Sequence, residues 1–347
     1  MDENARIAVV GMVAPAVIGL MAGVGAGVLK RVGAKHAPSA VAALGTFPAR
    51  AGEEGNEEFV GARVLAVVGV TMAVFVGLFG VYGMPGWPLA SSGDRLFLLP
   101  PGIGLVGLAG VILTAWRGRR SAGGERGLGW MVSSAAAGIG AAIGTAVALG
   151  PGFWNGKMAG TAGLVWVPVV FGVWSAVSAW GVGRIVRGSK NERTPSVPRF
   201  ARDTSPARAG EGGIVLVGVC AAVGAGLLGT GSKDLGLDEF TCAAASAGLV
   251  IGLMMVRGSA GPGAIGVVCG MLGALLGCGV MLSFTPWWVV GVLGCVAPAA
   301  VLADVVIGRK LGNVGGAAVR VGAAVVVAGI AVGPGIWSLV KLALGEG

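Results

Sequence analysis

Few residues in this 347-residue sequence carry side chains that could do chemistry. The one histidine, His36, lies in a basic stretch, so neither a Ser/His/Asp triad nor a Cys/His metal site can be assembled. The cysteines lie in or beside apolar segments, and their odd number does not suit a disulfide framework: Cys220, Cys242, Cys269, Cys278 and Cys295. We therefore predict no catalytic residues, no cofactor, no metal site and no enzyme activity.

Asp304 is the only acidic residue that we place inside an apolar segment. Ionisable groups within the hydrocarbon region are costly and usually functional. Asp304 lies near the predicted cytoplasmic end of its segment, so we expect an interfacial ion pair with Arg309 or Lys310. An ion-binding carboxylate is the alternative.

Asp234, Asp238 and Glu239 form a second acidic group, which we place in an outer turn with Asp94 nearby. Such carboxylates could bind a divalent cation. Acidic residues are also expected at a helix N-terminus from capping and from the helix dipole, and we prefer this explanation.

The elements that must position these residues are long apolar segments. Apolar residues make up 55% of the sequence and charged residues only 12%, against roughly 25% charged in a soluble domain. A bilayer-spanning helix needs roughly 17 to 25 apolar residues. We predict an all-α, polytopic membrane helical bundle with about ten spans, of which the sixth and seventh are the shortest: 7–29, 64–82, 96–116, 128–149, 162–182, 213–228, 240–256, 264–282, 287–307 and 321–339.

The net charge of +9 could suggest a nucleic-acid partner, but the basic residues lie between apolar segments and not along one face. Of the 25 Lys and Arg residues, 20 follow odd-numbered segments. The positive-inside rule places these loops in the cytoplasm and both termini outside. We therefore predict a multi-pass cell-membrane protein that contacts lipids and no nucleic acid.

The predicted spans divide into two five-helix blocks, residues 1–182 and 213–347, joined by a basic cytoplasmic linker, residues 183–212. Four similar Pro/Trp turns, on the side predicted to face outward, indicate parallel hairpin-like repeats. They begin at Gly83, Gly150, Thr285 and Gly333. Proline ends a helix, glycine turns the chain and tryptophan anchors at the headgroups; an aromatic ring around a vestibule is the alternative.

Glycine is the most unusual component, with 68 residues. Small residues four apart let transmembrane helices approach closely. We predict helix-packing faces that could also line a pathway, at Gly19, Gly23, Gly27, Gly140, Gly144, Gly218, Gly226, Gly266 and Gly270, with further pairs at Gly273/Gly277 and Gly329/Gly333. Such faces could also bind further copies of the chain or partner membrane subunits.

Trp174 falls near the middle of the fifth segment, where its indole N–H needs a partner inside the protein. Ser175, Ser178 or a facing carbonyl could supply it. We interpret Trp174 as a packing residue with one hydrogen bond, and a pathway residue is the alternative.

Two functions fit this sequence. The first is a permease or channel-like transporter for a small neutral or lipid-like solute that passes near segments one, four, six and eight. The second is a non-catalytic scaffold or assembly subunit. A polar cavity at mid-membrane would favour transport, whereas a sealed interior with small residues facing lipid would favour the scaffold.

Overall fold

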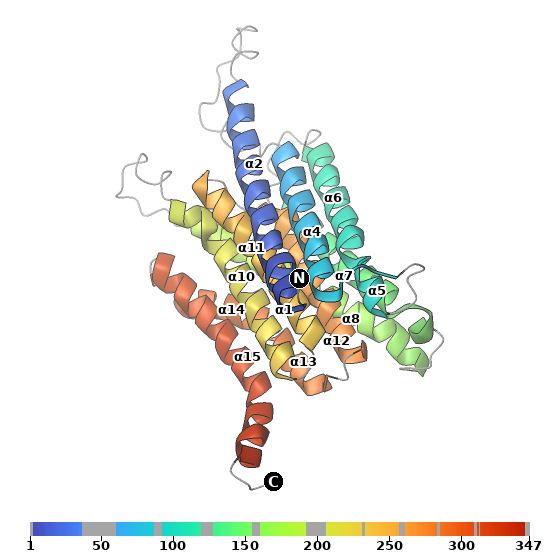
Figure 1. The fold of residues 1–347 in the computed structure, drawn as a ribbon. Helices are drawn as coiled ribbons and strands as arrows, with labels where there is room; N and C mark the ends of the chain where they lie inside the picture. The colour runs from blue at the N-terminus through green and yellow to red at the C-terminus, as the bar shows by residue number, and fades with distance from the viewer. Residues whose placement is uncertain are drawn as a thin grey trace, which may run out of the picture.

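The computed structural model describes residues 3–36, 60–86, 92–118, 128–154, 160–191, 206–230, 233–256, 261–282, 285–308, 311 and 313–343. These ranges are helical apart from turns and short connections, and they form the predicted all-α bundle (Figure 1). The elements are α1 (Glu3–Arg6), the π-helix η1 (Ile7–Val13), α2 (Ala14–His36), α4 (Val60–Tyr82), α5 (Ser92–Leu96), α6 (Leu99–Gly118), α7 (Leu128–Trp154), α8 (Gly160–Asn191), α10 (Pro206–Gly229), α11 (Lys233–Met255), α12 (Pro262–Leu282), α13 (Trp287–Gly294), α14 (Val296–Ala303), the π-helix η3 (Asp304–Gly308) and α15 (Asn313–Ala343).

Nine helices in the described ranges are long and apolar enough to cross a membrane, and α10 adds a shorter apolar stretch, Gly213–Gly229. All ten lie at predicted segments and show a multi-pass membrane protein, whereas a span at the sixth segment stays a prediction. Three predicted starts are wrong, because α10 begins at Pro206 instead of Gly213, α11 at Lys233 instead of Phe240, and α15 at Asn313 instead of Val321. All three predictions began the segment after its charged residues, which the structure includes in the helices.

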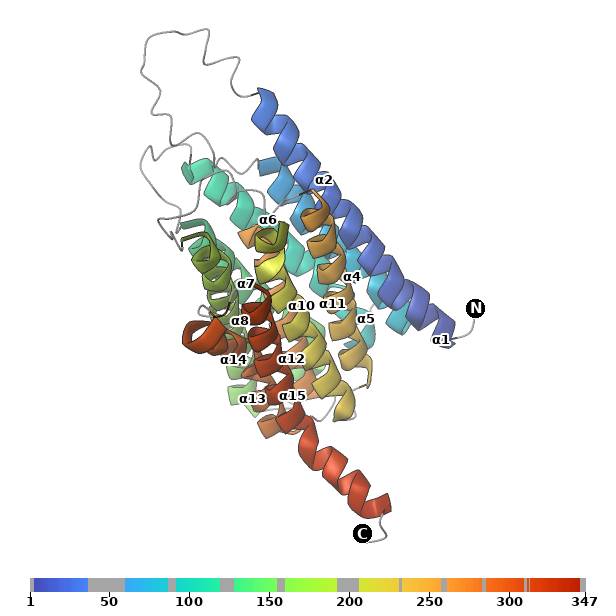
Figure 2. The ribbon, with the colours of Figure 1, turned by 90° about the vertical axis from the view of Figure 1, so that its left-hand side faces the viewer.

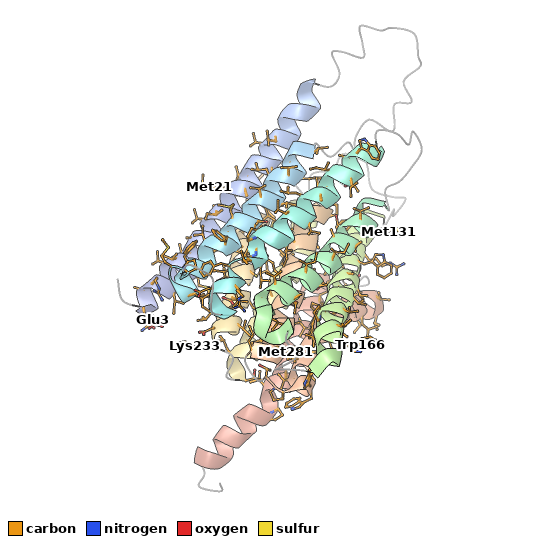
Figure 3. The ribbon with its side chains drawn as sticks, turned by 90° about the vertical axis from the view of Figure 1, so that its right-hand side faces the viewer. Glu3, Met21, Met131, Trp166, Lys233 and Met281 are labelled. Atoms are coloured by element: carbon orange, nitrogen blue, oxygen red, sulfur yellow. The ribbon has the colours of Figure 1, made fainter. Side chains whose placement is uncertain are left out.

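Helix α12 is the centre of the bundle. Of its span, 89% is buried inside the chain, whereas the values for the first span and for α15 are 28%. Helices α4, α6, α7, α8, α10 and α11 all contact it. Large apolar side chains such as Met21, Met131 and Trp166 are exposed on the outside, where they suit contact with lipid (Figure 3).

Helices from the two halves of the sequence are interleaved. Helix α2 packs along α11, α12 packs against α7 and α8, and α15 follows α10 (Figure 2). The predicted linker, residues 183–212, is partly helical, because α8 continues to Asn191 and α10 begins at Pro206. The division into two five-helix blocks stays a prediction.

Glu3, Lys233 and Met281 lie at one end of the bundle, which we call the outer end because the charge pattern predicts that it faces outward (Figure 3). Two of the four repeated turns are found here, and both begin with a glycine of positive φ, Gly83 at 80° and Gly150 at 66°. Arg6 donates to the backbone carbonyl of Gly80 in the last turn of α4, and Arg95 donates to that of Leu149, just before the kink at Gly150 in α7. Glycine permits the turn, and the arginine satisfies a helix-end carbonyl.

The turn that begins at Gly333 is different, because it does not end a helix. Pro334 lies inside α15, which continues to Ala343.

Candidate functional site

Two carboxyl side chains are fully buried near the outer end of α11. Asp238 and Glu239 are both 0% exposed. They lie five and six residues after Lys233, which places Glu239 about 9 Å along the helix from its first residue. The prediction that they belong to an exposed outer turn is therefore wrong.

Asp238 has one hydrogen-bond partner. The hydroxyl of Tyr82, the last residue of α4, donates to Oδ2 of Asp238 at 2.7 Å. Oδ1 of Asp238 has no partner among the described residues. Tyr82 is only half-buried, so this bond joins the buried carboxyl to the edge of the bundle.

Glu239 points toward α10. A Cβ atom added to Gly224 would lie 3.2 Å from the Cβ of Glu239, so the helices pack closely here. Cys220, one turn earlier on α10, interacts electrostatically with Glu239. Neither Oε1 nor Oε2 of Glu239 has a hydrogen-bond partner in the described part of the chain. Because an unpaired carboxylate is very costly in an apolar interior, this group must be accompanied by a proton or a cation.

A third buried polar residue fastens this end of α11 to the N-terminal segment. Thr241 donates its hydroxyl to the carbonyl of Gly11, in the π-helix η1, at 2.9 Å. Gly77 and Gly80 of α4 allow the close contact, because a side chain on either would collide with Thr241 or with the backbone of Gly11. The carboxyls are therefore enclosed by α4, α10 and the N-terminal helix.

The four acidic residues proposed for a divalent cation do not come together. Asp234 is exposed, whereas Asp238 and Glu239 are buried. Asp94 instead accepts a hydrogen bond from the backbone N–H of Gly86 at 3.0 Å. No group of three or more His, Cys, Asp or Glu residues within the described ranges is arranged to hold a metal ion.

Asp304 forms a different kind of buried charge, at the opposite end of the bundle. Its Oδ1 lies 2.6 Å from Nη2 and 2.9 Å from Nε of Arg320, and both residues are at most 5% exposed. The predicted partners, Arg309 and Lys310, lie outside the described residues. The observed partner is a different residue, because Arg320 precedes the predicted segment 321–339 but lies inside α15 in the structure.

Two glycines make room for this pair. A Cβ atom on Gly308 would lie 3.2 Å from Oδ1 of Asp304, and one on Gly316 would lie 3.3 Å from Nη2 of Arg320. The pair joins η3 to α15 and leaves little space for a ligand between them.

Glycine packing is closest between α2 and α11. Gly19 and Gly23 lie against Gly248 and Gly252, and a Cβ atom at any of these positions would collide with backbone of the opposite helix. Residues four apart on each helix thus form one continuous contact, as the spacing on α2 predicts.

The other predicted glycines also have close neighbours from different helices. Added Cβ atoms would meet Val256 from Gly27, Ile103 from Gly140, Leu99 from Gly144, Val321 from Gly218, Leu293 from Gly226, Ser133 from Gly266, Ile103 from Gly270, Ser175 from Gly273 and Thr145 from Gly277. Gly329 and Gly333 differ, because no atom lies within 4 Å of an added Cβ. These two glycines pack against no described helix, so for them only the predicted contact with another subunit stays open.

Trp174 has the internal partner that its position predicts. Its indole N–H donates to the carbonyl oxygen of Gly294, where α13 ends. Pro298, four residues later, has no N–H to bond this carbonyl in a regular helix. Trp174 therefore satisfies a carbonyl that the proline leaves free.

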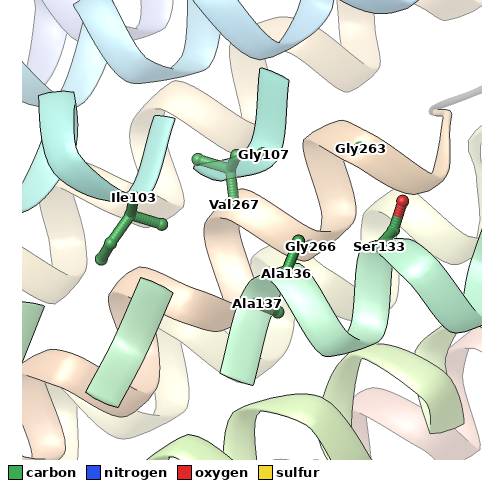
Figure 4. Close-up of a pocket in the computed structure, with 8 residues that line it drawn as sticks. All are labelled: Ile103, Gly107, Ser133, Ala136, Ala137, Gly263, Gly266 and Val267. Atoms are coloured by element: carbon green, nitrogen blue, oxygen red, sulfur yellow. The ribbon is translucent and has the colours of Figure 1, made fainter. Parts of the chain in front are cut away.

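Two helices of the predicted pathway, α7 and α12, border a crevice together with α6 in the described part of the structure. Its empty volume is about 200 Å³, including space open to the surroundings, and none of it is wide enough for a water molecule. Ser133 is its one hydroxyl-bearing residue (Figure 4); the others are Ile103, Gly107, Ala136, Ala137, Gly263, Gly266 and Val267. This crevice is not the polar cavity expected of an open transporter.

The length of the seventh predicted segment is a sequence signal that could have placed the two carboxyls inside a helix. Starting at Phe240, the segment is shorter than most of the others, whereas extending it toward Lys233 gives a helix of ordinary length that contains both acids. The partner Tyr82 is distant in sequence and could not be found in this way.

No family model, no curated protein and no solved structure matches this chain.

Proposed function

We propose that this multi-pass membrane protein is a transporter of a small neutral or lipid-like solute, and that the carboxyls of Asp238 and Glu239 take part in transport. The observation that carries this proposal is the burial of both carboxyls inside a spanning helix, with both oxygens of Glu239 unpartnered in the described structure. Acidic residues inside spans are rare and typically mark the path of a substrate or ion.

The contacts around α11 support a moving part at this position. Helices α2 and α11 meet through glycines on both sides, so their contact depends on shape and not on hydrogen bonds between side chains. Movement of α11 past α2 along these glycines would break few polar bonds, namely those of Thr241 with Gly11 and of Asp238 with Tyr82. The closed crevice between α6, α7 and α12 then belongs to an occluded conformation, and transport requires another arrangement.

Reconstituted protein in liposomes tests this function. We expect flux of at least one solute from a panel of small neutral compounds, and we expect Glu239→Gln to abolish it. Ser246→Ala is the matched control, because Ser246 is also buried and unpartnered on α11 but carries no ionisable group. Equal flux in all three proteins and in empty liposomes would contradict transport.

A scaffold or assembly subunit is the second candidate. The side of α15 that points away from the bundle favours it. Gly322, Gly329 and Gly333 have no atom within 4 Å of an added Cβ, so this face is open to a neighbour in the membrane. Co-purification of a membrane protein in fixed stoichiometry, lost in Gly329→Leu and accompanied by no flux, would favour the scaffold and contradict the transporter.

A further inference from the structure

We propose that Glu239 is a proton-binding site, and that the hydrogen-bonded pair of Tyr82 and Asp238 positions it at the outer end of the bundle. This inference deepens the proposed function and rests on it for its physiological role. The step is a reversible proton transfer: a carboxylate oxygen of Glu239 takes a proton from a hydronium ion, which forms the O–H bond of the neutral carboxyl, breaks one O–H bond of the hydronium and leaves water. The reverse step returns the proton to a water molecule.

The surroundings of the Glu239 side chain suit a proton-binding site and differ from those of a structural ion pair. It is 0% exposed, and neither of its oxygens has a hydrogen-bond partner among the described residues. Structural carboxyls in protein interiors are normally satisfied by donors, as Asp304 is by Arg320. A group that leaves both oxygens open can accept a proton without breaking an existing bond.

The groups around Glu239 favour a proton over a metal cation. Calcium and magnesium need about six or more oxygen ligands at short distances. On α10, Gly224 lies against the Cβ of Glu239, and the thiol of Cys220 is near enough to interact with it electrostatically. A proton needs no coordination shell, so it is the one cation that this closely packed position accommodates.

The ionisable groups that face the site from the packed helices are few. Tyr82 comes from α4, Cys220 from α10 and Cys278 from α12. Helix α11 itself contributes the remaining groups, Asp234, Asp238 and Cys242. Helix α2 and η1 also pack against α11. At the described contacts they present glycines and backbone atoms to it. None of these six groups, taken from the described part of the chain, is a cation, so a proton is the counter-charge that we propose.

Asp238 has the role of a positioning residue. It is adjacent to Glu239 on α11, and the two carboxyls interact electrostatically. Its bond from the Tyr82 hydroxyl anchors this turn of α11 to the end of α4. Removing the hydroxyl should therefore shift the titration of Glu239 without abolishing it, whereas removing the carboxyl of Glu239 should abolish it.

Infrared spectroscopy of the protein in liposomes tests the site directly. The C=O stretch of a protonated carboxyl should appear on lowering the pH and disappear on raising it. We expect Glu239→Gln to remove this band, Glu239→Asp to retain a shifted band, and Tyr82→Phe to move its midpoint. Ser246→Ala and Asp304→Asn should leave it unchanged.

A hydrophobic carbodiimide gives an independent readout, because it reacts with protonated carboxyls. Trypsin should release residues 234–257, which contain Glu239, separately from residues 258–309, which contain Asp304. We expect labelling at Glu239 that is lost at high pH and lost in Glu239→Gln, with Asp304 unlabelled.

Three outcomes separate this inference from the proposed function. A pH-dependent band that Glu239→Gln removes, with no solute flux, supports the proton site and contradicts transport. Solute flux without such a band contradicts the proton site and retains transport. A band that Glu239→Gln removes but that does not change with pH also overturns the inference, because Glu239 would then be a permanently neutral structural residue.

Discussion

The two ends of the bundle bury acidic side chains in opposite ways. Near the predicted cytoplasmic end, Asp304 is held by two nitrogen atoms of Arg320 within 2.9 Å. At the outer end, Asp238 has only the Tyr82 hydroxyl, and Glu239 has no hydrogen-bond partner in the described structure. Burial is nearly complete in both places, so the difference lies in the partners and not in exposure to water.

This difference separates a carboxyl that is held in a structural ion pair from one that is free to bind a proton or another cation. A buried ion pair contributes little net stability, but removing one member leaves an uncompensated charge, so each member is needed while the other is present. A carboxyl without a partner can be kept only in a neutral or cation-bound form. We therefore expect substitutions in the pair of Asp304 and Arg320 to lower the free energy of unfolding. Substitutions of Glu239 should change function and have little effect on the free energy of unfolding.

Breaking the ion pair should have the largest effect. Arg320→Gln leaves Asp304 buried without its cation and should lower the free energy of unfolding by about 3–5 kcal/mol. Reversible unfolding in mixed detergent micelles measures this loss. The double variant Asp304→Asn with Arg320→Gln should recover most of the stability, and a double variant as unstable as the sum of both single variants would contradict a coupled pair.

Removing the Tyr82 hydroxyl should have the next largest effect. Tyr82→Phe takes away the one described hydrogen bond to Asp238, and an unsatisfied buried acceptor costs about 1–3 kcal/mol. The same unfolding assay measures the change. Phe79→Leu, at the same end of α4, serves as a control for lost aromatic packing without a lost hydrogen bond. A fully stable Tyr82→Phe protein would show that Asp238 needs no donor.

An uncharged, partly buried hydrogen bond provides a reference for the two charged regions. Trp174→Phe removes the N–H that satisfies the carbonyl of Gly294, and hydrogen bonds between membrane helices are worth about 0.6 kcal/mol on average, with about 1.7 as a maximum. We expect a loss within this range, measured as a shift in the unfolding midpoint. The loss should be smaller in a Pro298→Ala background, because alanine restores the helix N–H for Gly294.

Neutralising Glu239 should have a small effect on stability. Glu239→Gln keeps the shape of the side chain and exchanges one buried polar group without a described partner for another, so we expect a change of no more than the roughly 1 kcal/mol typical of point mutations. The change is measured beside that of Asp304→Asn, the matched substitution at the other end. If Glu239→Gln were as destabilising as Asp304→Asn, the distinction between the two regions would be lost.

Sequence reasoning reached the all-α class and all ten helical segments, because an apolar run long enough to span a bilayer has few alternatives. It also found the close packing of Gly19 and Gly23 and the need of Trp174 for an internal partner. Sidedness and the repeated architecture remain predictions from charge and motif patterns. The error on Asp238, Glu239 and Arg320 came from treating charged residues as the ends of spans.

The amino-acid sequence by itself determined where the helices are and which faces are small enough to pack, because hydropathy and residue size act locally along a helix. Only the tertiary structure decided which charges are paired. Arg320 of α15 contacts Asp304 of η3, and Tyr82 of α4 contacts Asp238 of α11, which is 156 positions later in the sequence. The electrostatic environment of a buried carboxyl depends on neighbours that come from other helices, so its chemical role follows from the packing and not from its own segment.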